Sequence, residues 1–187
     1  MKIIGVIMTY NCGELVQNAI NQIPKNEFDQ IICTDDGSSD NTLEVIKKNN
    51  IQYIQNSHLG YGMNLFSGMK KAFALGATHV VELHGDSQYD FSYVKEMKKK
   101  FEEGSDLVLG NRFFDYKQPL NDGMPIHIYL GNIFLTILGK IGLGIKNNDL
   151  FQGFRGYSKE LFNKINVDNY NQDYRFSYEI IAQSYFL

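Results

Sequence analysis

The segment from Glu82 to Gln88, Glu-Leu-His-Gly-Asp-Ser-Gln, concentrates the side chains best suited to chemistry. Asp86 and Gln88 are two residues apart, so in an extended loop both side chains can point to one side. Carboxylate and amide oxygens suit a hard divalent cation such as Mg²⁺ or Mn²⁺, which diphosphate oxygens would also ligate. His84 could be a third ligand or donate a hydrogen bond to a phosphate or ribose. An acid after a strand is often only a turn residue, so both interpretations stay open.

Two adjacent acids, Asp35 and Asp36, begin a second polar segment, Asp-Asp-Gly-Ser-Ser-Asp-Asn-Thr, that ends at Thr42. Gly37 permits a turn, and the side chains at 38–40 can accept hydrogen bonds from the first amides of a following helix. Capping does not explain why two acids stand together at a strand end, where they repel each other. One of them could instead accept a hydrogen bond from the N–H edge of a uracil or guanine.

Gly60 and Gly62 begin a helical pattern that follows a strand. Leu65 occupies the position of the third glycine in Gly-x-Gly-x-x-Gly, so the segment is not a complete dinucleotide loop. Close backbone approach at the helix start explains the glycines equally well. The helix N-terminus is still a favourable place for a phosphate or ribose.

Arg112 and Arg155 each lie beside glycine and aromatic residues. Arginine usually lies on a solvated surface, and this interpretation is strong for Arg155 taken alone. The planar guanidinium can also bind a phosphate through two parallel hydrogen bonds. The sequence leaves both interpretations open.

Strand and helix patterns alternate along the first 110 residues. The pattern predicts an α/β fold with a mainly parallel central sheet flanked by helices. Polar, glycine-bearing loops follow each predicted strand, and ligands of such sheets bind at the carboxyl ends of the strands. The predicted strands are 3–8, 30–34, 51–54, 78–83 and 106–109, and the predicted helices are 14–23, 40–49, 62–75 and 91–103.

Length and composition predict one domain over residues 1–187, with a net charge of −3. The charge provides no basic field for a nucleic-acid partner. Cys12 and Cys33 match no metal spacing and favour a reduced, cytosolic setting. The apolar region 126–145 is interpreted as a helix that is buried or lies on a surface, not as a membrane span. Two short helices are expected after Ser158, and the second reaches the C-terminus without a stop signal, as in a chain truncated there.

Five segments, in their order and spacing, resemble family 2 glycosyltransferases of the Rossmann-like GT-A fold, and specifically the dolichyl- or polyprenyl-phosphate sugar transferases. The resemblance runs from Ile3 to about Glu179. One departure concerns the metal motif Asp-x-Asp-x-Gln, in which this chain has His84 in place of the first acid. The five segments are Val6–Asn11, Asp35–Thr42, Gly60–Asn64, Gly110–Phe113 and Asp149–Arg155.

The resemblance implies a role for each matching position. Asp86 and Gln88 would hold Mg²⁺ or Mn²⁺, and Asp36 would read the base. Arg112 and Arg155 would face the acceptor phosphate or the donor diphosphate. If the acceptor is a hydroxyl, a carboxylate base is required, with Asp149 or Glu179 as the candidate. The expected nucleotide-sugar contacts are Thr9, Tyr10, Asn11, Glu14, Asp36, Gly60, Gly62, His84, Gly85 and Asp86, and the expected catalytic residues are Asp86, Arg112, Arg155 and Asp149.

The expected function is metal-dependent, inverting transfer of a sugar from a UDP- or GDP-linked donor to a polyprenyl or dolichyl phosphate in cell-envelope glycan synthesis. The expected location is cytoplasmic, with peripheral contact to the cytoplasmic face of a membrane. Alternatives are transfer to a glycan hydroxyl and, because of His84, a nucleotide-sugar-binding module without activity. A nucleotidyltransferase is disfavoured, because it should carry a glycine-rich basic motif where this chain has Thr9–Glu14.

Overall fold

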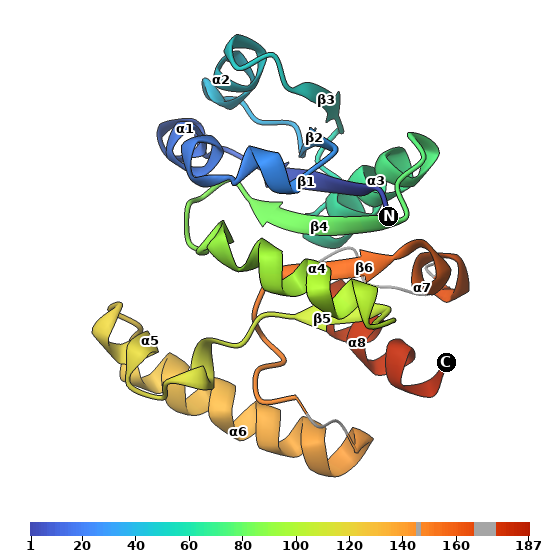
Figure 1. The fold of residues 1–187 in the computed structure, drawn as a ribbon. Coiled ribbons are helices and arrows are strands. Elements are labelled where there is room, and N and C mark those ends of the chain that lie inside the picture. Colours follow the sequence, from blue (N-terminus) through green and yellow to red (C-terminus); the bar gives the residue numbers. More distant parts are fainter. Residues whose placement is uncertain (145–146, 167–174) are drawn as a thin grey trace.

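The computed structural model describes residues 1–144, 147–166 and 175–187. It is an α/β fold with a six-stranded sheet in the order β3-β2-β1-β4-β6-β5 (Figure 1). The strands are β1 (Ile3–Thr9), β2 (Gln30–Asp35), β3 (Gln52–Gln55), β4 (His79–His84), β5 (Leu107–Leu109) and β6 (Arg155–Ser158). The α-helices are α1 (Gly13–Gln22), α2 (Thr42–Lys48), α3 (Tyr61–Ala74), α4 (Val94–Glu102), α5 (Gln118–Asn121), α6 (Ile126–Leu143), α7 (Lys159–Lys164) and α8 (Phe176–Phe186). Single 3-10 turns are η1 (Lys25–Glu27), η2 (Phe91–Tyr93) and η3 (Arg112–Phe114).

Strand β1 lies inside the sheet, between β2 and β4, and all seven of its residues are buried. Alternate side chains enter the two layers of core, with Ile3 and Ile7 on one face and Ile4 and Val6 on the other. Helices α1 and α4 cover the first face, and α3, α7 and α8 cover the second. A strand buried on both faces needs a continuous apolar run, which is why the sequence pattern identified it.

The prediction of a mainly parallel sheet is confirmed. Strands β1 to β4 pair in parallel, whereas β6 pairs antiparallel with both β4 and β5. Strand β6 was not predicted from the sequence. Its residues, Arg-Gly-Tyr-Ser, offer neither an apolar run nor alternation, and the strand exists because it fills the space between β4 and β5.

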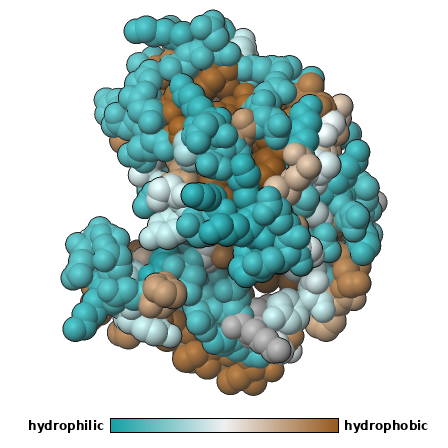
Figure 2. All heavy atoms as spheres, in the orientation of Figure 1, coloured by the Kyte–Doolittle hydropathy of each residue, from teal (hydrophilic) through white to brown (hydrophobic). Residues whose placement is uncertain are grey.

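Helix α6 lies at one end of the molecule beside α5 (Figure 1). Thr136 is the one buried side chain of this 18-residue helix, all of which is described. The alternative that the helix is buried is therefore wrong, and the structure agrees with a surface helix. Its mean hydropathy of 1.5 and its length would also suffice for crossing a membrane. Figure 2 shows brown, hydrophobic atoms over this end of the molecule.

Candidate active site

The carboxyl ends of three parallel strands bring the predicted site segments to one edge of the sheet. Thr9 is in register with Asp35, and Met8 is in register with His84. Two backbone bonds keep the loops adjacent beyond the strands: the Asp36 amide donates to Thr9 O over 2.9 Å, and the Gly85 amide donates to Met8 O over 2.9 Å. The expectation that the polar loops converge on one edge is confirmed for these three strands.

The Asp35 side chain stabilises the turn that follows β2. Its buried carboxylate accepts from the amides of Gly37 at 3.1 Å and Ser38 at 2.9 Å, and from the Thr9 hydroxyl at 2.9 Å. These are the bonds expected of a carboxylate that stabilises a turn. Asn11 joins the same turn, because its side-chain oxygen accepts from the Ser39 amide at 2.8 Å. The structural interpretation of the acid pair therefore holds for Asp35.

Asp36 points the other way, to the loop between β3 and α3. Its two oxygens accept from the amides of Leu59 at 2.6 Å and Gly60 at 2.9 Å, and His58 Nδ1 lies 3.4 Å from Oδ2. Both acids can thus stand together, because each faces a different set of N–H donors. Base recognition by Asp36 stays a prediction, and the carboxylate has a second role in holding this loop.

His58 is a candidate site residue that sequence reasoning missed. Its side chain is 64% exposed, its φ is +57°, and its ring lies 4.7 Å from the ring of Tyr10, centroid to centroid. Tyr10 itself is 49% exposed. Together they form an exposed aromatic pair beside Asp36, which we call the Tyr10–His58 pair. The sequence signal was only that His58 lies in a polar loop after a strand.

Three of the remaining positions predicted to contact the nucleotide-sugar, Gly60, Gly62 and Glu14, lie at the starts of helices, and Gly85 follows β4. Gly60 precedes α3 with a φ of +86°, a conformation that favours glycine. Gly62 is buried in the first turn of α3. Glu14 is exposed in the first turn of α1. Gly85 sits tightly against β1, because an added Cβ would lie 2.8 Å from Thr9 Cγ2.

Asp86 and Gln88 form a tight turn, so the expectation that they lie in an extended loop is wrong. Ser87 between them has a φ of +60°, and the Gln88 amide donates to Asp86 Oδ1 over 3.2 Å. Asp86 is half-buried and Gln88 is exposed, and Gln88 and Tyr89 line a hollow of about 420 Å³. No three His, Cys, Asp or Glu side chains gather as a metal cage among the described residues. A cation here would depend on few protein oxygens plus phosphate oxygens and water, which is how Mg²⁺ usually binds beside a nucleotide.

His84 is turned into the protein. Its Nε2 lies 3.0 Å from Glu82 Oε1, and its side chain is 14% exposed. Glu82 also accepts from the hydroxyls of Tyr61 at 2.5 Å and Tyr157 at 2.8 Å. Burial works against the charge of Glu82, but the His84 hydrogen bond holds the pKa of this carboxyl below its usual value. His84 is thus part of a buried polar network.

Arg112 and Asp149 form a two-point ion pair. Arg112 Nε lies 2.8 Å from Asp149 Oδ2, and Nη2 lies 3.0 Å from Oδ1. The Asp149 side chain is fully buried and that of Arg112 is 26% exposed. Burial of Arg112 opposes its charge, yet the Asp149 partner raises the pKa of the guanidinium. This position argues against Asp149 as a general base, because both of its oxygens already bind Arg112. The other candidate, Glu179, lies in the first turn of α8.

Arg155 lies inside the fold at the start of β6. It is 2% exposed, and its Nε donates to Gln152 O over 2.7 Å. Burial opposes the charge, while Tyr157 and Glu82 raise the pKa of the guanidinium. In this position Arg155 cannot reach a phosphate at the surface, so the prediction of a phosphate clamp is not supported for it. The guanidinium instead balances the charge of Glu82 from within.

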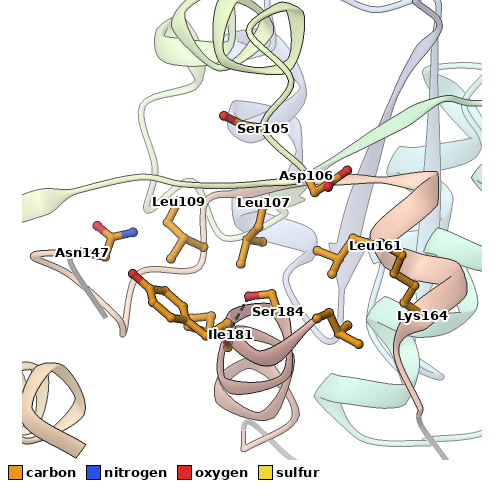
Figure 3. A pocket seen from close by; sticks show the side chains of 11 residues that line it. Ser105, Asp106, Leu107, Leu109, Asn147, Leu161, Lys164, Ile181 and Ser184 are labelled. Carbon is orange, nitrogen blue, oxygen red and sulfur yellow. Dashed lines mark hydrogen bonds between the residues drawn. The ribbon is translucent and has the colours of Figure 1, made fainter. Parts of the chain in front are cut away.

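A separate cavity of about 600 Å³ lies between β5, α7 and α8. In Figure 3, Leu107 and Leu109 from β5 point toward Ile181 and Ser184 of α8. None of the predicted site residues lines this cavity, so it is distinct from the site at the strand ends.

The α/β fold with polar loops at the strand ends is that of a GT-A glycosyltransferase, and the family match shows the enzyme class. The chain belongs to the family described as Glycosyl transferase family 2, whose model matches residues 6–166. Similar curated proteins include the UDP-N-acetylglucosamine–dolichyl-phosphate N-acetylglucosaminyltransferase of Methanococcus voltae, 28% identical, covering 82% of this chain and 68% of the relative. The dolichyl-phosphate hexose transferase of Haloferax volcanii is 26% identical, covering 87% and 69%. The predicted family, fold and enzyme class are confirmed.

Solved structures support the same fold. Glucosyl-3-phosphoglycerate synthase from Mycobacterium tuberculosis, in complex with Mn²⁺, UDP-glucose and phosphoglyceric acid, has a TM-score of 0.72 at 16% identity. The match covers 99% of this chain and 65% of that one. The complex of the same enzyme with Mn²⁺, UDP and glucosyl-3-phosphoglycerate has a TM-score of 0.64 at 18% identity, and the match covers 86% of this chain and 57% of that one.

Proposed function

We propose that this glycosyltransferase moves a sugar from a nucleoside diphosphate sugar to a polyprenyl or dolichyl phosphate. The observation that carries the proposal is the Asp86–Gln88 turn, which lies at the same strand edge as the Tyr10–His58 pair. The first offers oxygen ligands and the second an aromatic surface. A nucleoside diphosphate fits both, because its diphosphate shares a cation with the oxygen ligands and its base stacks on the aromatic surface. The names of the two dolichyl-phosphate transferases support the choice of acceptor.

On the donor side, the Tyr10–His58 pair would stack on the base, and Asp36 would accept from its N–H edge. UDP and GDP both offer such an edge. A bound Mg²⁺ or Mn²⁺, held by Asp86 and Gln88, would neutralise charge on the departing nucleoside diphosphate. The protein's own part is to hold the donor across the strand ends and to orient the acceptor for inversion at the anomeric carbon.

The state of Asp149 favours a phosphate acceptor over a hydroxyl. A hydroxyl must lose its proton, so its transfer needs a general base. Asp149, one of the two acids proposed for that role, is fully buried and bound to Arg112 through both oxygens. A lipid phosphate is already anionic near neutral pH and needs little base assistance. The partly exposed Arg112 guanidinium, held by Asp149, is suited to orienting that anion.

The exposed surface of α6 supports an acceptor that resides in a membrane. Apolar side chains are exposed along the whole helix, including Phe134 at 60% and Ile141 at 78%. Such a surface is expected at an interface with lipid. The proposal therefore includes peripheral contact of α6 with the cytoplasmic face of the membrane.

The transfer is tested with radiolabelled UDP- and GDP-sugars and polyprenyl phosphate in detergent, with EDTA and with added Mn²⁺. We expect product only with the divalent ion, and a loss of at least about 100-fold in Asp86→Ala. Asp115→Ala is the matched control, because Asp115 accepts the same kind of turn bond, from the Lys117 amide at 2.9 Å, and does not line the hollow beside Gln88. Full activity of Asp86→Ala would refute the metal assignment. Donor binding without transfer to any acceptor would support the inactive binding module, and transfer only to a sugar hydroxyl would support the glycan alternative.

Membrane contact is tested separately by flotation with vesicles that contain polyprenyl phosphate. Phe134→Glu and Ile141→Glu should each reduce flotation severalfold, because a charge in the bilayer interface is costly. Tyr93→Glu is the control: Tyr93 is 61% exposed in η2 and lies outside α6. Equal flotation of all three variants and the parent would contradict the assignment of α6.

A further inference from the structure

Glu82 is a charged residue in the middle of the sheet. It lies in β4, its side chain is 0% exposed, and its neighbours on the strand belong to the apolar core. A buried carboxylate is costly unless all of its oxygens are paired. Glu82 avoids that cost through three donors from three elements: Tyr61 of α3, Tyr157 of β6 and His84 at the end of β4. Such a group is a candidate for a role beyond packing.

The pairing determines which nitrogen of His84 carries a proton. Glu82 already accepts from the hydroxyls of Tyr61 and Tyr157, and an ionised carboxylate is only an acceptor. Every neighbour of Glu82 must therefore donate, so Nε2 of His84 carries its hydrogen. This conclusion holds for both the neutral and the charged ring. Nδ1 is then the only ring nitrogen left for a ligand.

The ring has little freedom to turn away from Glu82. Tyr89 packs edge-on at 4.8 Å and the Tyr61 ring lies at 5.9 Å, measured between centroids. Gly153 closes a further side, since a Cβ there would lie 2.7 Å from His84 Nε2. The Gly153 amide also donates to the Tyr89 hydroxyl over 3.2 Å. The orientation of His84 is thus set by residues from four separate parts of the chain.

We propose that Glu82 is a positioning residue of the donor site, which holds Nε2–H of His84 inside the protein and leaves Nδ1 to the bound donor complex. His84 ends β4 two residues before Asp86, so it stands at the edge where the donor diphosphate and its cation are proposed to bind. The link to the donor rests on the proposed function. The orientation of the ring and its dependence on Glu82 do not rest on it. Partners of a ligating histidine typically matter about 10- to 100-fold for affinity or activity.

The ring is observed directly by NMR of protein labelled with ¹⁵N-histidine. The chain has only four histidines, so each can be assigned by substitution. We expect His84 to show a proton on Nε2, and to lose this fixed state in Glu82→Gln and Glu82→Asp. Glu82→Asp keeps the charge near Arg155 but shortens the reach to His84, so it separates anchoring from charge balance. His79, whose Nδ1 lies 3.0 Å from the Thr78 hydroxyl, is the internal control and should not change.

Tyr157→Phe gives a second route if both Glu82 variants fail to fold. It removes one donor to Glu82 without touching His84, and we expect the His84 signals to shift from those of the parent while the His79 signals stay in place. Addition of UDP with Mg²⁺ to the parent should move the Nδ1 resonance of His84 and leave that of His79 in place. In transfer assays we expect Glu82→Asp to lose about 10- to 100-fold in kcat.

The results separate the two proposals. A proton on Nδ1 in the parent, or His84 signals that are unchanged in Glu82→Asp, would overturn the positioning role even if the enzyme is fully active. A fixed Nε2 proton that depends on Glu82, found in a protein without transferase activity, would leave the positioning role standing and refute the proposed function. An Nδ1 resonance of His84 that does not move when UDP with Mg²⁺ is added would refute only the link between His84 and the donor.

Discussion

Asp149 binds Arg112 at three points: it accepts from Nε at 2.8 Å, from Nη2 at 3.0 Å and from the backbone amide at 3.1 Å. The two residues are 37 positions apart, and their pairing connects the loop after β5 with the segment before β6. The carboxylate thereby determines where the guanidinium can point. Asp149 therefore positions Arg112 and has no free oxygen for proton transfer.

Removal of the Asp149 charge should cost stability, because Arg112 would be left partly buried without its partner. Asp149→Asn should lower the free energy of unfolding by about 3–5 kcal/mol, measured by urea denaturation. The matched control is Lys98→Met, which breaks the more exposed pair between Lys98 and Glu27. That change should cost no more than about 1 kcal/mol. Equal losses in the two variants would contradict the special role of the Arg112 pair.

The Tyr10–His58 pair should dominate base binding. Tyr10→Ala should weaken UDP or GDP binding about 5- to 150-fold in calorimetry, since stacking on an aromatic ring contributes about 1–3 kcal/mol. Tyr53→Ala serves as the control, because Tyr53 is a similarly exposed tyrosine, on the edge strand β3. An unchanged dissociation constant in Tyr10→Ala would place the base elsewhere.

Two glycines should respond in opposite ways to a methyl group. Gly153→Ala would bring Cβ within 2.8 Å of the Tyr89 hydroxyl, and the resulting overpacking should cost about 1–3 kcal/mol in thermal unfolding. Gly131 in α6 has no heavy atom within 4 Å of such a Cβ. Gly131→Ala should therefore stabilise the protein by up to about 1 kcal/mol through helix propensity. A Gly153→Ala variant as stable as the parent would show that the loop can yield.

Alkaline pH should destabilise the protein through its two thiols. Burial raises the pKa of Cys12 to about 11 and that of Cys33 to about 12. In the unfolded chain a thiol releases its proton near about pH 8.5, so above that pH the folded state retains protons that the unfolded state has lost. Each thiol then lowers stability by about 1.4 kcal/mol per pH unit until its folded pKa is reached. The contribution of the two protonated thiols to the free energy of unfolding is complete below about pH 8.5 and is lost as the pH rises.

The measurement is urea denaturation between about pH 8 and about pH 10, where any titration of tyrosines is common to the parent and the variant. In Cys33→Ala the slope of stability against pH should be shallower by about 1.4 kcal/mol per unit. The baseline stability of the variant can differ without affecting this comparison. Parallel slopes in parent and variant would show that Cys33 does not keep its proton in the folded state.

The sequence by itself determined the class of fold and the edge at which the site lies. The run Ile3–Met8 specifies a strand that is buried on both faces, and polar residues directly after such a run must lie at its carboxyl end. The acid turn at Asp86 and the polar loop after β2 were predictable for this reason. Periodicity and turn chemistry act between near neighbours, so they can be read without coordinates.

Only the tertiary structure decided what each side chain does at that edge. Asp35 and Asp36 are adjacent and chemically identical, yet one holds its own turn and the other holds the loop at Gly60. Arg155 was a candidate phosphate ligand until β6 placed it beside Glu82 inside the sheet. The Tyr157 bond to Glu82 spans 75 positions. Contacts across such separations depend on how strands and helices pack, and no local pattern in the sequence encodes them.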